Sequence, residues 1–194
     1  VTNSRVISSE IKSTGGSDGG EIGGIAGRGR SYGNKIINAS VDANTTISGG
    51  NIVGGVLGAA VWQTNVKNSY SLAKVESDHN SVGGLIGKVG GSSDQIIENS
   101  YAAGNVTGSS NIGGLIGENT SSNAQVTNSY WDINKTGQTS SVGGTGLNTT
   151  EMQNKTNYNN WDFQTNWAIN PGNNYPVLME GEGTSENPFK LSTC

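Results

Sequence analysis

The chain has little charge, little proline, one cysteine, one histidine and no long apolar run. Its net charge of −4 and its lack of charge runs argue against nucleic-acid binding. No stretch approaches the roughly 18 apolar residues of a membrane helix, so we expect no membrane insertion. The first residues lack the basic-then-apolar pattern of a signal segment. The single Cys194 excludes an internal disulfide framework, although a protein stabilised by repetition needs none outside the cell.

The small shares of proline and of charge also argue against disorder. Charged residues make up 13% of the chain and there are three prolines, whereas glycine, at 31 copies, is the commonest residue. Disordered chains usually carry more proline or more net charge. The apolar residues form short, β-branched runs at a fixed spacing. We therefore expect a folded chain with a long, thin core.

A glycine-rich phrase returns about every 30 residues. Its copies IGGIAG, VGGVLG, VGGLIG and IGGLIG begin at Ile22, Val53, Val82 and Ile112. A weaker copy, VGGTGL, begins at Val142, so the intervals are 31, 29, 30 and 30 residues. Such a constant period is typical of a repeat architecture.

A second phrase precedes each glycine phrase and carries an asparagine and, later, a tyrosine. The asparagine recurs at Asn3, Asn38, Asn68, Asn99 and Asn128. The tyrosine follows two residues after the last three, at Tyr70, Tyr101 and Tyr130. We expect the amides to form a hydrogen-bonded ladder at a corner of each repeat, and the tyrosine rings to stack.

The repeat contains strand signals and no convincing helix before residue 147. Short apolar runs rich in Val and Ile are separated by Gly, Asn and Ser, unlike the longer pattern of helical repeats. Strands that recur once per repeat can stack in parallel. We therefore predict an all-β fold, a parallel β-solenoid (β-helix) of about five repeats over residues 1–146. A β-sandwich is the rival architecture, but it would not demand so strict a period.

The glycines of the phrase predict close contact between sheets. Alternation along one strand places Ile112, Gly114 and Ile116 on the same face of the sheet. A thin solenoid has no room for a large side chain at every inward position, so glycines stack on glycines. The predicted column is Gly24, Gly55, Gly84 and Gly114. We expect the last glycine of each phrase to supply a turn with positive φ.

The repeat fades in the last quarter of the chain, which is rich in aromatic residues. Residues 147–158 predict a short helix whose N-cap is Asn148 or Thr149. We interpret residues 147–179 as an aromatic cap that covers the open edge of the last repeat. Residues 180–194 are interpreted as a linker or the start of a following block.

Several stretches together resemble one family. VTNSY, the [IV]GGLIG phrase, SYWD, GTGL-TTEMQ and WDF-T-WAI-PG-NYPVL are similar to parts of GLUG-motif repeat proteins, and the similarity covers residues 1 to about 193. The resemblance implies a large bacterial protein, secreted or on the cell surface, of the kind found among adhesins and in immunoglobulin-A-cleaving metallopeptidases. It also implies that this chain is a segment of a longer parent chain.

The acidic side chains that could support catalysis lie on different repeats. Polysaccharide-degrading β-helices need two carboxylates close together, or a carboxylate-bound calcium ion with a base nearby. Two aspartate pairs share a column, but in each pair other repeats lie between the two members: Asp18 with Asp78, and Asp42 with Asp132. We expect neither pair to meet.

The remaining reactive side chains form no known catalytic set. His79, beside Glu76 and Asp78, is the one histidine, so neither the H-E-x-x-H zinc motif nor a serine–histidine triad is present. Cys194 has no candidate base beside it. We expect no metal, no cofactor and no enzymatic activity.

Variation between repeats concentrates in the loop after each glycine phrase, and such loops form one continuous surface. We expect Arg28, Arg30, Tyr32 and Trp62 to lie near one another there. Arginine and exposed tryptophan favour contacts with a protein or a sugar, so this loop face is the candidate binding site. The alternative for Trp62 is that it covers a gap in the local core.

We interpret the chain as a non-catalytic, extracellular β-solenoid segment, a rigid spacer whose adhesive face contacts a host glycan or protein. One alternative is an accessory region that positions the glycoprotein substrate of a secreted immunoglobulin-A-type metallopeptidase. A second is a β-helix enzyme that degrades polysaccharide. Head-to-tail self-association of such segments into filaments is left open.

Overall fold

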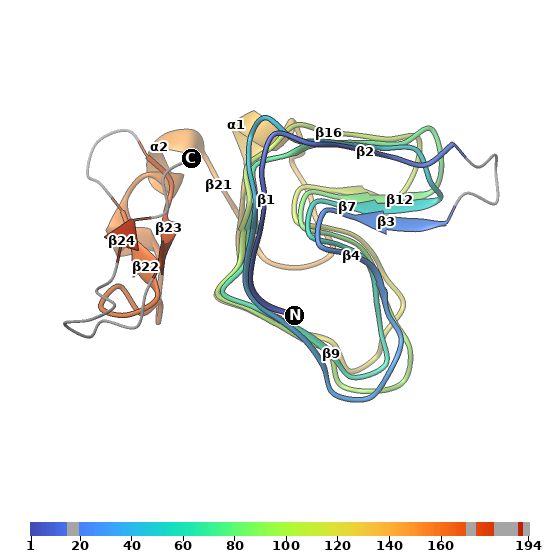
Figure 1. Ribbon diagram of the computed structural model, residues 1–194, viewed down its shortest axis with the longest axis horizontal. Helices are drawn as coiled ribbons and strands as arrows, with labels where there is room; N and C mark the ends of the chain where they lie inside the picture. Colours follow the sequence, from blue (N-terminus) through green and yellow to red (C-terminus); the bar gives the residue numbers. More distant parts are fainter. Residues whose placement is uncertain (15–19, 170–173, 181–189, 192–194) are drawn as a thin grey trace.

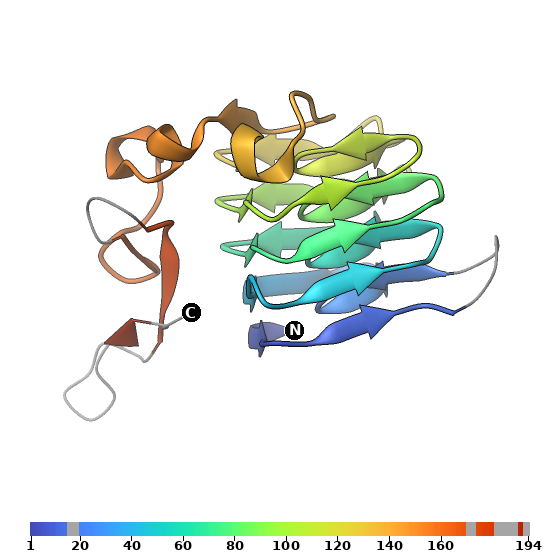
Figure 2. The same cartoon turned by 90° about the horizontal axis from the view of Figure 1, so that it is seen from above.

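The computed structural model describes residues 1–14, 20–169, 174–180 and 190–191. Successive turns of the chain superpose when viewed along the axis of the molecule (Figure 1), and they form stacked layers in the side view (Figure 2). The chain returns to one corner at Asn3, Asn38, Asn68, Asn99 and Asn128, and so completes four turns. The predicted parallel β-solenoid is confirmed, with four turns where about five were expected. We number them turn 1 to turn 4 from Asn3.

The largest sheet of the solenoid flanks the asparagine corner on both sides. The strands at both ends of this sheet are short. Strand β5 continues through the corner and so joins the two flanks. Its strands are β1 (Thr2–Val6), β5 (Asn34–Val41), β9 (Thr64–Lys67), β10 (Tyr70–Ser71), β14 (Ile96–Glu98), β15 (Tyr101–Ala102), β19 (Gln125–Thr127), β20 (Tyr130–Asp132) and β21 (Thr145–Leu147).

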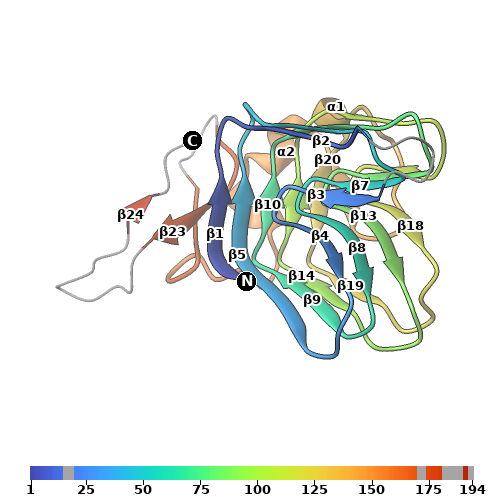
Figure 3. The ribbon, with the colours of Figure 1, turned by 45° about the vertical axis from the view of Figure 1, so that its right-hand side comes forward.

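Three four-stranded parallel sheets complete each turn (Figure 3). The upper sheet of Figure 1 contains β2 (Glu10–Lys12), β6 (Thr46–Ser48), β11 (Lys74–Glu76) and β16 (Val106–Thr107). The chain then turns back into β3 (Glu21–Gly23), β7 (Ile52–Gly54), β12 (Ser81–Gly83) and β17 (Ile112–Gly113). It leaves the centre again through β4 (Ala26–Gly29), β8 (Leu57–Val61), β13 (Ile86–Gly90) and β18 (Ile116–Asn119).

The glycine phrases stack in the predicted register. Val53 pairs with Ile22 below and Val82 above, and Val82 pairs with Ile112. The expectation that each phrase forms a single strand is wrong, because the chain bends after the first glycine and a second strand begins at about the fifth position. The bend separates two strands that belong to different sheets. The side chains of the phrase therefore do not alternate between two faces along its whole length.

The glycines allow neighbouring walls to touch through bare backbone. A Cβ on Gly84 would lie 2.7 Å from the Cβ of Ala102 on the opposite wall, and closer still to the carbonyl oxygen of Gly114. The last glycine of the phrase does not have the positive φ that was expected. A Cβ on Gly58 would instead lie 2.7 Å from the backbone nitrogen of Ile22, on the strand that faces it. Close approach therefore explains both columns.

The asparagine column is explained by the backbone. All five corner asparagines have positive φ, from 46° to 55°, a region that asparagine tolerates better than other residues with a side chain. Asn38 donates from Nδ2 to Oδ1 of Asn3 at 3.1 Å, as a ladder requires. The Oδ1 atoms of Asn38 and Asn99, however, are buried and accept no hydrogen bond within the described residues. The expected ladder is therefore only partly formed.

A serine ladder runs beside the asparagines. The N–H of Ser69 donates to Oγ of Ser100 at 3.1 Å, and the N–H of Ser100 donates to Oγ of Ser129 at 3.3 Å. The Ser100 hydroxyl in turn donates to the carbonyl oxygen of Glu98 at 2.9 Å. The sequence shows this serine in every NSY phrase, but its role was not predicted. Buried N–H groups at the corner are satisfied in this way.

The tyrosine column lies on the outer surface of the largest sheet. Tyr70 and Tyr101 stack with a centroid distance of 5.1 Å and an interplanar angle of 8°, which confirms the expected ring stacking for this pair. Tyr130 instead packs edge-to-face against Tyr158, at 5.2 Å and 79°. The column therefore serves as a docking surface for the end of the chain.

We call residues 149–169 and 174–180 the C-terminal arm. The arm descends beside the solenoid (Figure 2), and its aromatic residues bury the tyrosine column, with Trp167 fully buried. The predicted aromatic cap therefore covers a side wall, where the tyrosine rings offer apolar surface, more than it covers the open end. Its elements are α2 (Thr149–Met152), the 3₁₀ helix η1 (Lys155–Asn157), β22 (Trp167–Ala168) and β23 (Val177–Glu180), with β24 (Lys190–Leu191) pairing to β23.

The predicted helix is present but short. Asn148 is its N-cap, and a capping box with Glu151 fixes its first turn. The chain leaves the α conformation after Met152 and makes the 3₁₀ turn η1. A further helix, α1 (Ile133–Thr136), follows the last strand of the repeat and was not expected from the sequence. Its N-cap is Asp132 and it ends at Gly137 in the left-handed region.

The fifth glycine phrase covers the final turn and does not continue the column. The N–H of Gly114 donates to Ser140 at 3.0 Å, and the N–H of Val142 donates to the carbonyl oxygen of Ile116 at 3.3 Å. After Gly144 the chain joins the largest sheet as β21. Residues 138–147 therefore close the top of the core. Head-to-tail stacking of these segments would have to displace them.

Candidate functional site

The loops that follow β4 and β8 place two aromatic side chains together on the surface. Tyr32 and Trp62 meet edge-to-face, with ring centroids 5.6 Å apart and planes at 62°. Both are exposed, Tyr32 at 67% and Trp62 at 42% of its surface. Trp62 therefore contacts another exposed ring and keeps much of its own surface open, a geometry that suits a contact surface.

Hydrogen bonds hold the Trp62 loop in one shape. Trp62 has a φ of 59°, unusual for a bulky residue, and its carbonyl oxygen accepts from the N–H of Thr64 at 2.8 Å. The same oxygen accepts from Nε2 of the fully buried Gln95 at 2.6 Å. Gln95 also donates to Gly90 and accepts from Ser121, so it ties together the loops of turns 2, 3 and 4. No pattern in the sequence marks Gln95, which is one polar residue among many in its loop.

The two arginines of the predicted loop face differ in their surroundings. Arg28 forms an ion pair with Glu21 at 3.0 Å, across the narrow gap between β3 and β4. Arg30 is exposed and makes no ion pair with any described residue, and the same is true of Lys35 at the start of β5. The structure thus brings Tyr32 and Trp62 into contact, and the strand register places the backbone of Arg30 next to the loop of Trp62. The charge of Arg28 is already compensated.

Further along the same gap, Lys88 forms an ion pair with Glu118 at 3.1 Å, and Oγ of Ser81 donates to Glu118 at 2.6 Å. Burial alone would raise the pKa of Glu118, but the hydrogen bonds from Ser81 and Lys88 outweigh it and lower that pKa. These charges satisfy one another. They leave little net charge there for a ligand.

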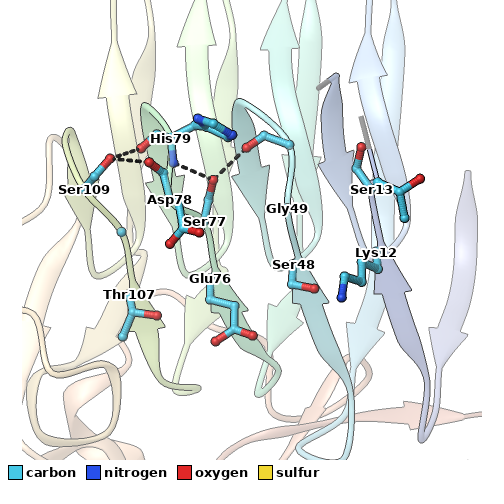
Figure 4. A pocket seen from close by; sticks show the side chains of 13 residues that line it. Lys12, Ser13, Ser48, Gly49, Glu76, Ser77, Asp78, His79, Thr107 and Ser109 are labelled. Carbon is cyan, nitrogen blue, oxygen red and sulfur yellow. Dashed lines mark hydrogen bonds between the residues drawn. The ribbon is translucent and has the colours of Figure 1, made fainter. Parts of the chain in front are cut away.

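A polar depression of about 780 Å³ lies at the opposite edge of the solenoid (Figure 4). Its floor is a row of aligned side chains on the upper sheet, Lys12, Ser48, Glu76 and Thr107. Its rim is the loop from Ser77 to His79, in which the Ser77 hydroxyl donates to Gly50 at 2.6 Å and accepts from the N–H of His79 at 3.0 Å. The one histidine and two carboxylates, Glu76 and Asp78, therefore line the same depression.

The aspartates of the predicted column do not meet. By register, Leu72 and Ala103 lie between Asp42 and Asp132. Oδ1 of Asp42 accepts from the hydroxyl of Thr45 at 2.8 Å, and Asp132 is fully buried. Both carboxylates are used inside the fold. Asp18 and Cys194 lie outside the described residues.

Asp132 links the solenoid to the C-terminal arm. Its Oδ1 accepts from the N–H of Lys135 at 2.9 Å, and its Oδ2 accepts from the hydroxyl of Tyr175 at 2.5 Å. Burial, together with the adjacent carboxylate of Asp132, raises the pKa of Tyr175 above its ordinary value. Burial also raises the pKa of Tyr158. The phenols of Tyr158 and Tyr175 therefore stabilise the docked arm in their neutral form.

The described residues include no group of three or more His, Cys, Asp or Glu side chains that could hold a metal ion. Within the same ranges, no helix is long and apolar enough to cross a membrane. Comparison of the chain with models of protein families, with curated proteins and with solved structures finds no match. The loop face and the polar depression are therefore the two candidate functional sites of the described residues.

Proposed function

We propose that this chain is a non-catalytic β-solenoid segment of a large bacterial extracellular protein, a rigid spacer that presents a ligand-binding loop face. The observation that carries the proposal is the exposed Tyr32–Trp62 pair on a loop that hydrogen bonds hold in place. Exposed aromatic rings lose little conformational entropy on binding, so they are common anchors of recognition surfaces. Secretion or attachment to the cell surface rests on the resemblance to GLUG-motif repeat proteins.

The role of spacer is supported by the way the turns are joined. Each turn is hydrogen-bonded to the next along every wall, and the core of stacked Val, Leu and Ile side chains continues through all four turns. Because each turn contacts only its neighbours, such a stack keeps its direction while its length grows with the number of repeats. A rigid stack holds the loop face at a fixed distance from the rest of a parent chain.

The test is binding of the chain to arrays of glycans, matrix proteins and immunoglobulin A. A specific ligand should lose affinity by about 30-fold in Trp62→Ala, as expected for a central aromatic anchor. Lys74→Gln is the control, since Lys74 lies on the upper sheet and should bind like the parent chain. Binding that Trp62→Ala leaves unchanged would contradict the role of the loop face. Silence from folded protein would leave only the spacer.

The polar depression favours a second function, degradation or modification of a polysaccharide. A linear sugar chain lying across the turns would meet Glu76, Asp78 and His79 together, at the point where it crosses turn 3. The check is to incubate the chain with plant and bacterial polysaccharides and to measure the reducing ends that are released. Activity that His79→Ala abolishes, with folding unchanged, would replace the non-catalytic proposal.

An accessory role beside a metallopeptidase differs from adhesion in the ligand alone. It predicts that the array signal is confined to the glycoprotein substrate of such an enzyme, with immunoglobulin A as the first one to examine. A signal on unrelated glycans would favour the adhesive role.

A further inference from the structure

We propose that the loop face recognises a pyranose sugar that carries a carboxylate, a uronic acid or a sialic acid. The inference rests on the proposed binding role of the loop face and names its ligand class. It is carried by the juxtaposition of an exposed aromatic pair, Tyr32 and Trp62, with the uncompensated cation Arg30.

The aromatic pair selects for a ring with an apolar face. The two rings meet at 62°, so they form the two sides of an open corner and not a closed stack. One side of a pyranose ring presents C–H groups, and such a surface packs on the face of an indole while its hydroxyls stay in water. The fixed φ and the hydrogen bonds of Trp62 hold its backbone in place before any ligand arrives. Preorganisation of this kind lowers the entropic cost of binding.

The register of the strands places Arg30 beside the aromatic pair. Gly29 pairs with Ala60, so Arg30 lies next to the Trp62 loop and two residues before Tyr32. Its guanidinium presents a planar fork that matches a carboxylate bidentately, a geometry that lysine cannot reproduce. Arg28, two residues earlier on β4, is compensated by Glu21, which leaves Arg30 as the arginine free to pair with a ligand.

The charges around the site also predict the orientation of the bound ligand. Lys35, exposed at the start of β5 directly after the loop of Arg30, adds a second cation on turn 1. The nearest acidic residue of the equivalent loops is Asp94, which by register lies on turn 3, beyond Trp62. The whole chain carries a net charge of −4, so this cationic corner stands out against an anionic background. The carboxylate should therefore point toward turn 1.

The experiment titrates the chain with pairs of sugars that differ only in charge, by calorimetry or by chemical-shift changes of the Trp62 indole. Trigalacturonate is compared with its methyl ester, and sialyllactose with the methyl ester of its sialic acid. We expect the acid of one pair to bind at least tenfold more tightly than its neutral partner, and the pair that responds identifies the source of the carboxylate. Arg30→Gln should remove that preference, Arg30→Lys should restore only part of it, and Lys74→Gln should change neither.

The outcomes separate the inference from the proposed function. Equal binding of acid and neutral sugar, still lost in Trp62→Ala, would overturn the carboxylate class and leave the loop face as a binding site. A preference for the acid that survives in Arg30→Gln would overturn the role of Arg30. Absence of binding to all four sugars, while the arrays reveal a protein ligand, would overturn the inference alone.

Discussion

In the solenoid, the neighbours of a side chain are its own counterparts in adjacent turns, whereas in the C-terminal arm each contact occurs once. Val82 lies between Val53 and Ile112, which occupy the same position of the repeat. Trp167 of the arm instead contacts Tyr70 and Tyr101 of the tyrosine column and Trp161 of the arm itself, and none of these is a counterpart of Trp167 in another turn. A repeated contact can be inferred from the period of the sequence, but a contact made once cannot.

The two regions also differ in how their stability is distributed. In a stack of turns, the free energy of unfolding is approximately a sum of similar terms between neighbours. The arm has one docking surface, built around the tyrosine column and joined to the solenoid by hydrogen bonds from Tyr101 to Pro176 and from Trp161 to Asn128. Damage to the arm should therefore release it as a unit and leave the turns in place.

Trp167→Ala tests that independence with the largest expected effect. Removal of this fully buried indole should cost about 4 kcal/mol of docking free energy, because it leaves a large cavity among the rings. Limited proteolysis should then cut within residues 149–180, while the β-sheet signal in far-ultraviolet circular dichroism is retained.

The matched control is Trp167→Phe, which keeps a buried ring and removes the indole N–H, a group without a partner among the described residues. The phenylalanine variant should stay resistant to the protease. Loss of the sheet signal in Trp167→Ala would show that the solenoid depends on the arm, and the comparison between the two regions would then fail.

Gly84→Ala should damage the solenoid and spare the docking surface. The new Cβ would lie 2.7 Å from the Cβ of Ala102, with the backbone of turn 4 directly above, so two walls must separate. We expect a loss of about 3 kcal/mol, measured as a lower midpoint of urea unfolding. Gly20→Ala is the control, because a Cβ there would meet nothing within 4 Å and its φ is not positive. Equal midpoints for the two variants would refute close packing as the reason for the glycine column.

The fold could be predicted from the sequence wherever the chain repeats itself. The period placed Ile22, Val53, Val82 and Ile112 in one column, and the structure confirms that register. The same argument was wrong for Val142, whose spacing matches the period. The residues after that valine lead the chain back across the core as a cover. Spacing alone does not distinguish a continuing turn from a closing one, since both need glycine at a close approach.

The candidate site was harder to predict, because loops do not follow the period. The contact between Tyr32 and Trp62 was expected from their place in equivalent loops, and the structure places the two rings together. The compensation of Arg28 by Glu21 could not be foreseen, since it depends on two strands of one turn that face each other across a narrow gap. The role of Gln95 depends likewise on three loops whose lengths differ.

The smallest expected effect is a difference in response to pH. Folding raises the pKa of Tyr175, first by burial and then through the carboxylate of Asp132, so the docked arm favours the neutral phenol. A released tyrosine ionises near its ordinary pKa of about 10. The stabilisation is therefore complete below about pH 10 and is lost as the pH rises above it, and the arm should become sensitive to an alkali-tolerant protease before the solenoid unfolds.

Tyr175→Phe should cost about 1.5 kcal/mol of docking free energy at neutral pH, because Asp132 loses a donor. It should also weaken the dependence on pH, with the raised pKa of Tyr158 responsible for what remains. Tyr32→Phe, which changes an exposed tyrosine away from the arm, should release the arm at the same pH as the parent chain. If Tyr175→Phe also released the arm at the same pH as the parent chain, the hydrogen bond between Tyr175 and Asp132 would not be the cause of the arm's greater sensitivity to alkali.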